Sequence, residues 1–102
     1  MDIIVEDSFD EERYEARTVD GQLAGFAAYQ LAPNLIVLTH TEVGREFEGR
    51  GVASSLIRGA LDDIRQRQIP MLALCPFVKA FLLRHPEYRD LEYMPPGSAA
   101  HD

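Results

Sequence analysis

The hydrophobic pattern changes from the period of a strand to that of a helix after residue 43, and this change restricts the possible folds more than any other feature. Residues 35–43, LIVLTHTEV, are rich in the apolar and β-branched residues that favour a strand. From about residue 51 to residue 68, apolar side chains recur at the spacing of one helix face. Pro70 then begins a second apolar strand, MLAL. Two strands joined by a helix in this way predict a parallel pair.

The residues before this unit predict strands that run antiparallel to one another. Two tight turns, at Asp20-Gly21 and Pro33-Asn34, separate segments of strand composition. The expected strands cover residues 3–6, 13–19, 22–31 and 35–43. After MLAL, a short helix over 76–84 ends at His85-Pro86. The predicted class is α+β, an antiparallel meander followed by a parallel β-α-β unit and a short C-terminal helix.

Length and charge exclude several classes of protein. The 102 residues predict one domain over residues 1–93 and a flexible tail over 94–102. A net charge of −7 argues against binding to duplex nucleic acid or anionic membranes. No apolar run reaches membrane-spanning length, and the acidic start lacks the order of a signal peptide. We expect a cytoplasmic protein, a monomer or weak homodimer, that binds no nucleic acid, membrane or metal.

Gly49 and Gly51 precede the long helix, where glycine contributes little to stability. A helix N-terminus exposes unpaired backbone N–H groups and carries a partial positive charge. Glycines allow a ligand to approach this backbone closely, so a strand, a glycine turn and a helix are typical of a phosphate-binding site. A plain loop is the alternative, because the same spacing also occurs without a ligand.

The segment VGREFEGRGVASSL resembles the acetyl-coenzyme A signature of the GNAT superfamily of N-acetyltransferases. That signature is a Gln or Arg, two residues, a Gly, one residue, and then a Gly or Ala. Glu48, Gly51 and Ala53 occupy these places, and the glutamate is a departure. THTEV, LCPFV and HPEYRDL follow in an order that resembles the small YjdJ-type GNAT proteins, in which a Glu before the first glycine is usual. The resemblance extends from about residue 15 to residue 91.

The resemblance implies a minimal GNAT fold that uses acetyl-CoA as co-substrate and transfers the acetyl group to an unidentified amine. It implies that the pyrophosphate lies on the backbone amides of residues 50–54, and that the pantetheine pairs with the strand edge of residues 41–43. A contact between His85 and a cofactor phosphate is also expected. The expected cofactor-binding residues are Thr41, Val43, Glu48, Gly49, Arg50, Gly51, Val52, Ala53, Ser54 and His85.

His40 and Glu42 are candidate catalytic residues. By the two-residue period of a strand, they are expected to share one face with Ile36 and Leu38. That apolar face would then end in an imidazole and a carboxylate beside the glycine turn, as a base or proton relay. One alternative is a strand end that becomes polar because it reaches solvent. A metal site is another, but two ligands are poor evidence for it.

Cys75 is the third candidate, and as the single cysteine it excludes an internal disulfide. It precedes Pro76, so its thiol is expected at a helix N-terminus, where the dipole favours thiolate and Lys79 can add positive charge. A buried, packing cysteine is the alternative. In the YjdJ-type proteins, the cysteine at this place is suspected of a role in acetyl transfer. Two routes stay open: direct attack with Glu42 or His40 as base, or transfer through Cys75 activated by His40.

Two functions compete on the sequence. The three candidate catalytic residues favour an acetyltransferase, whereas the lack of the elements that build the acceptor site in larger GNAT enzymes favours a non-catalytic module that binds acetyl-CoA or coenzyme A. The acceptor groove is expected to be shallow and open, or supplied by a partner. The core is expected to include Phe26, Tyr29, Phe77, Phe81 and Leu82. Glu15 is expected at the surface.

Overall fold

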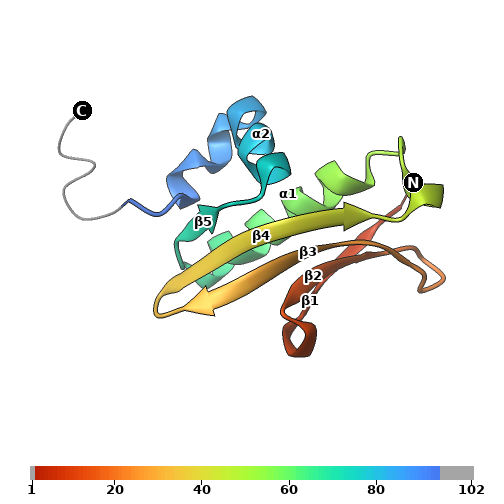
Figure 1. Cartoon of the computed structure of the whole chain (residues 1–102), viewed down its shortest axis with the longest axis horizontal. Helices are drawn as coiled ribbons and strands as arrows, with labels where there is room; N and C mark the ends of the chain where they lie inside the picture. Colours follow the sequence, from red (N-terminus) through yellow and green to blue (C-terminus); the bar gives the residue numbers. More distant parts are fainter. Residues whose placement is uncertain (1, 95–102) are drawn as a thin grey trace.

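A computed structural model describes residues 2–94 as a five-stranded sheet with two α-helices (Figure 1). The strands are β1 (Ile4–Ser8), β2 (Arg13–Arg17), β3 (Leu23–Ala32), β4 (Leu35–Val43) and β5 (Met71–Ala73). The α-helices are α1 (Val52–Arg67) and α2 (Pro76–Arg84). Three short 3-10 helices are η1 (Phe9–Glu11), η2 (Arg45–Phe47) and η3 (Pro86–Leu91). The predicted tail lies outside the described residues, except for Met94.

The sheet has the predicted topology. Strands β1 to β4 pair antiparallel in chain order, and β4 pairs parallel with β5 across the helix α1. The expected α+β class and the order of meander and β-α-β unit are therefore confirmed. Strand β2 ends at Arg17, two residues earlier than expected, because Thr18 already belongs to the turn and accepts a hydrogen bond from the N–H of Gly21.

Helix α1 covers one face of the meander and supplies much of the core (Figure 1). Its buried side chains are Val52, Leu56, Ile57, Ala60, Leu61 and Ile64. Burial of a large aliphatic side chain contributes roughly 1.5–3 kcal/mol relative to exposure. The approach of α1 to β1 is close because Gly59 has no side chain: a Cβ there would lie 2.7 Å from the Cβ of Val5.

A polar network also joins α1 to the meander. The hydroxyl of Tyr14 donates to Asp63 at 2.7 Å, and Arg67 contacts both Asp63, at 2.9 Å, and Asp7, at 2.6 Å. Tyr29 donates to Asp7 at 2.6 Å. Burial and the hydrogen bond to Asp63 hold the pKa of Tyr14 well above its usual value, so the hydroxyl stays a donor.

Strand β4 contains an extra residue relative to β3. Tyr29 lies opposite Leu38, but Ala28 lies opposite His40, so Thr39 forms a β-bulge. Cross-strand partners point to the same face of a sheet. The bulge shifts the alternation by one residue, and His40 therefore does not share a face with Leu38. The expectation that His40 and Glu42 continue the apolar face of β4 is wrong for this reason.

The sheet consequently has two different faces. Thr41 lies in register with Ala27 and the buried Tyr14, on the face that α1 covers. His40 lies in register with Ala28 and Arg13 on the opposite face, which no helix among residues 2–94 covers. We call this second face the open face and define it by Glu6, Arg13, Glu15, Arg17, Phe26, Ala28, His40 and Glu42. Phe26 is only partly buried there, so its expected place in the core is wrong.

None of the helices within residues 2–94 combines the length and the apolar character needed to span a bilayer.

The close packing at Gly59 can be tested by substitution. Gly59→Ala is expected to lower the free energy of unfolding by about 1–3 kcal/mol, because the added methyl group overpacks against Val5. Urea denaturation measures this change, and Ser55→Ala at an exposed position of the same helix is the control. The cost should shrink in a Val5→Ala background, which lacks two of the three closest atoms. A Gly59→Ala protein at least as stable as the wild type would contradict the packing argument.

Candidate active site

The site begins where β4 and β5 separate. Their pairing runs only from Ile36 with Met71 to Leu38 with Ala73. The carbonyl of Leu38 then accepts two N–H groups, from Leu74 at 2.9 Å and from Cys75 at 3.1 Å, as the chain turns into α2. The edge of β4 from His40 to Val43 thus has no β5 partner. This is the strand edge expected to pair with pantetheine, and no strand among residues 2–94 pairs with it there.

The glycine turn lies at the end of that free edge. Gly49 and Gly51 both have a φ of 77°, a left-handed conformation that favours glycine. A Cβ at either position would meet nothing within 4 Å, so the glycines are needed for backbone conformation and leave open space beside them. No side chain within residues 2–94 caps α1, and its first helical hydrogen bond runs from Ser55 to Gly51. The preceding amides of residues 52–54 therefore have no acceptor within the helix.

A pocket of about 210 Å³ occupies this end of the sheet. It brings together most of the predicted cofactor-binding residues with two aromatic side chains: Val43, Phe47, Glu48, Gly49, Gly51, Val52, Ala53, Ser54 and Phe77. Phe47 was missed in the sequence, and Phe77 was assigned to the core although it is only partly buried. In the sequence, only the position of Phe77 in the first helical turn after Cys75-Pro76 could have indicated that it lies near the candidate site.

Three of the expected cofactor-binding residues do not line this pocket. Arg50 lines a wider groove of about 820 Å³ between the glycine turn and the β2–β3 turn. Thr41 lies further along the free edge of β4. His85 follows the last residue of α2, where its ring stacks on Phe81 at 4.1 Å and its Nδ1 lies 3.3 Å from Arg58. His85 therefore lies beside the side chain of Arg58, a residue about two helical turns after Gly51.

Cys75 lies at the fork between the two strands. It precedes α2 directly, as predicted, with Pro76 in the first turn. The side chain is 4% exposed, and its Sγ lies 3.3 Å from the hydroxyl oxygen of Thr41. The burial of Cys75 agrees with the alternative of a cysteine that only packs in the core. Its contact with the Thr41 hydroxyl and its position at the fork also place it beside the candidate site.

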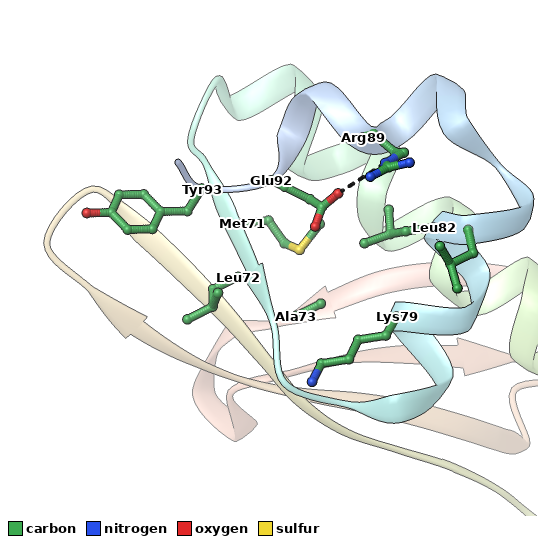
Figure 2. A pocket seen from close by; sticks show the side chains of 9 residues that line it. Met71, Leu72, Ala73, Lys79, Leu82, Arg89, Glu92 and Tyr93 are labelled. Atoms are coloured by element: carbon green, nitrogen blue, oxygen red, sulfur yellow. Dashed lines mark ion pairs between the residues drawn. The ribbon is translucent and has the colours of Figure 1, made fainter. Parts of the chain in front are cut away.

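Lys79 does not join this site. It lines a separate pocket of about 280 Å³ at the outer edge of β5, together with Met71 and Ala73. Figure 2 shows its ammonium group on that side of the strand, below the ion pair of Arg89 and Glu92, whose atoms are 3.7 Å apart. The expected contribution of Lys79 to the charge around Cys75 has no support in this arrangement.

His40 and Glu42 form a pair on the open face. Nε2 of His40 lies 2.8 Å from Oε2 of Glu42, and both side chains are 59% exposed. The ring of His40 also lies 6.3 Å from the ring of Phe26, edge to face. A hollow of about 170 Å³ beside them is lined by Phe26, Glu42 and the adjoining ends of β3 and β4. The pair can accept protons from a group that approaches this face.

The β4 backbone therefore separates two sets of candidate groups. Thr41 and Cys75 lie on the helix side, and His40 and Glu42 lie on the open side. Within residues 2–94, no three or more His, Cys, Asp or Glu side chains gather in a way that could hold a metal ion. The arrangement is suited to a ligand held along a strand edge and a reacting partner that approaches from the other face.

A family comparison agrees with this geometry. The sequence model of the GCN5-related N-acetyl-transferases matches residues 13–91, which is most of the chain. The chain belongs to the GCN5-related N-acetyltransferase family. The resemblance to the GNAT superfamily is thereby confirmed, and the YjdJ-type subgroup is compatible with it.

Other proteins are similar to this GCN5-related chain over part or all of its length. Protein NATD1 of Gallus gallus is 29% identical over 62 residues, which are 61% of this chain and 56% of that protein. Protein NATD1 of Bos taurus is 31% identical over 62 residues, or 61% and 55% of the two chains. The chain thus matches little more than half of the length of these relatives. A GCN5-like candidate N-acetyltransferase from Staphylococcus aureus has the same fold, with a TM-score of 0.66, 21% identity, and coverage of 97% of this chain and 96% of that one.

The burial of Cys75 in this GCN5-related domain makes a prediction about its reactivity. Its thiol should react with iodoacetamide at least about tenfold more slowly than an exposed thiol, because the reagent needs a local opening. A Leu74→Cys, Cys75→Ser protein is the matched control, since Leu74 is the adjacent residue and is 53% exposed. Intact mass measured over time gives both rates. Equal rates would show that the folded chain exposes Cys75.

Proposed function

We propose that this protein is an acetyl-CoA-dependent N-acetyltransferase that acts on an amine. The observation that carries the proposal is the free edge of β4, which runs from the fork at Leu38 to the glycine turn and has candidate proton acceptors on its open side. Membership of the GCN5-related family supports the same class of reaction.

The residues at the glycine turn fit the pyrophosphate of coenzyme A. An anion at this position would meet the amides of residues 52–54, which have no acceptor in α1, and the positive end of the helix dipole. The open space beside Gly49 and Gly51 allows close approach to the backbone. Glu48 lines the same pocket, and its negative charge would repel a pyrophosphate there. The residue is exposed, so its carboxylate can point toward solvent.

Acetyl-CoA supplies the acetyl group as an activated thioester. The amine attacks the carbonyl carbon, a C–N bond forms, the C–S bond breaks, and coenzyme A leaves as the thiol or thiolate while the amine loses a proton. His40 and Glu42 are placed to take that proton. When Nε2–H of His40 donates to Glu42, Nδ1 is left as the acceptor, and the carboxylate stabilises the imidazolium that forms.

Direct attack is the route that we propose. Transfer through Cys75 with His40 as its activating base requires the two side chains to meet, but they lie on opposite faces of β4. Thr41 is the polar group beside the thiol instead. We propose that Cys75 and Thr41 line the helix side of the fork and act in binding.

A non-catalytic coenzyme A-binding module is the second candidate. The shallow open face favours it, because no helix among residues 2–94 encloses an acceptor there. The two functions share the cofactor site and differ in whether the pair on the open face accelerates transfer.

Cofactor binding is the first test. Coenzyme A at ten times its Kd should raise the free energy of unfolding by about 1.4 kcal/mol, and Tm by several degrees. Gly51→Asp should abolish the shift, because it places a carboxylate beside the proposed pyrophosphate site. Asn34→Asp is the charge-matched control, since Asn34 also has a positive φ and lies at the other end of β4. No shift of the wild type at millimolar coenzyme A would remove the basis of both functions.

The proton acceptors are tested by turnover. Glu42→Gln and His40→Gln should lower kcat/KM for primary amines about 100-fold, the lower range for loss of general-base catalysis. Release of the coenzyme A thiol measures turnover, and the thermal shift by coenzyme A should be unchanged in both variants. Glu46→Gln, an exposed change in η2, is the control. Full activity of both variants would mean that the pair is only a polar strand end.

A further inference from the structure

We infer that the amine acceptor carries an anionic group, and that Arg13 on the open face binds it. This inference rests on the proposed function, because it concerns the substrate of the same site. The inference is based on the position of Arg13, which lies on the other side of Phe26 from the His40–Glu42 pair. Its guanidinium is fixed by neighbours but uses only Nε as a hydrogen-bond donor within residues 2–94.

Two neighbours fix the position of Arg13. Its Nε donates to Glu15 at 2.8 Å, and its guanidinium lies 4.7 Å from the centre of the Phe26 ring. Its terminal nitrogens have no hydrogen-bond partner among residues 2–94, and the side chain is 25% exposed. A planar guanidinium held in this way can donate two parallel hydrogen bonds to a carboxylate or phosphate.

Arg17 has the same partner, but each of its three guanidinium nitrogens already donates a hydrogen bond. Its Nε and one terminal nitrogen donate to Glu15, at 3.1 and 2.8 Å, and the other terminal nitrogen donates to the carbonyl of Gly21 at 2.9 Å. Arg17 thus supplies a full positive charge and two hydrogen bonds to Oε1 of the buried Glu15, and Oε2 accepts only the Nε–H of Arg13 among residues 2–94. Arg13 adds a second cation for a single carboxylate.

Glu15 itself remains ionised in this setting. Burial alone would raise its pKa, but hydrogen bonds from Arg17 and Arg13 outweigh burial, and the pKa is lowered. Glu6 lies opposite Glu15 on β1 and forms no ion pair within residues 2–94. The open face thus carries charges of both signs, and it fits an acceptor with an amine at one end and an anion at the other.

The spacing sets the size of the acceptor. Arg13, Ala28 and His40 are in register on three adjacent strands, so the backbones of Arg13 and His40 are about 10 Å apart, two strand spacings. The guanidinium lies 4.7 Å and the imidazole 6.3 Å from the centre of the Phe26 ring, so one ligand that crosses this ring can reach both groups. With a hydrogen bond at each end, the acceptor would have several bonds between amine and anion. A dipeptide has this size, and the Phe26 ring would lie beneath its middle.

Glycylglycine and its C-terminal amide test the inference, because they present the same amine and differ only at the far end. The wild type should acetylate glycylglycine with a kcat/KM about tenfold higher or more, as expected for charge-assisted hydrogen bonds. Arg13→Gln should bring the two values within about twofold. Arg17→Gln is the matched control and should keep the preference. In parallel, glycylglycine should shift the NMR signal of Arg13 Nε–H in the protein with coenzyme A bound.

Each outcome has a distinct meaning. Equal use of the two peptides by the wild type, or the same loss of preference in both arginine variants, would overturn the inference while leaving the acetyltransferase intact. If neither peptide is acetylated and other primary amines also fail, the proposed function is wrong. The NMR titration then still decides whether Arg13 binds the carboxylate, and an unchanged Nε–H signal at saturating peptide would refute it.

Discussion

The extra residue at Thr39 controls which side chains of β4 can act together. Without it, the strand period would direct His40 toward α1 and Thr41 away from it. With it, the hydroxyl of Thr41 reaches Cys75 on the helix side, and His40 pairs with Glu42 on the open side. Because of this one extra residue, the two faces at the end of β4 differ chemically. Thr41 and Cys75 lie on one side of the strand, and His40 and Glu42 lie on the other.

The fork depends on a second constraint, the shortness of β5. The carbonyl of Leu38 accepts both hydrogen bonds from the chain as it leaves the sheet, so within residues 2–94 no later residue of β4 is paired on this edge. Unpaired edges are normally a risk for aggregation. Here the edge runs toward the glycine turn, where a pocket lies against the unpaired start of α1. The free edge and the free amides are neighbours, which is why we interpret them as one extended ligand site.

The sequence predicted the topology well because each element carries its own local signal. The bounds of β4 and α2 matched the expectation at both ends. For the glycine turn, the residues alone left an anion site and a plain loop as alternatives. The faces of His40 and Glu42 could not be predicted, since a bulge depends on pairing with β3 and leaves no mark in the period of β4. Glu15 was placed at the surface because a lone carboxylate is rarely buried. Its burial depends on two arginines that alternate with it on the same strand.

The position of α1 links the stability of the fold to the candidate site. No side chain among residues 2–94 caps its N-terminus, so its location is fixed by contacts further along the helix. Gly59 allows the helix to approach Val5 closely, and Asp63 and Arg67 bind the tyrosine and aspartate side chains of the meander. These contacts lie about two to four helical turns from the glycine turn. Side chains placed at the glycine turn itself would compete with a ligand for the free amides. The helix is therefore held at its middle and end, and its polar start is left available for binding.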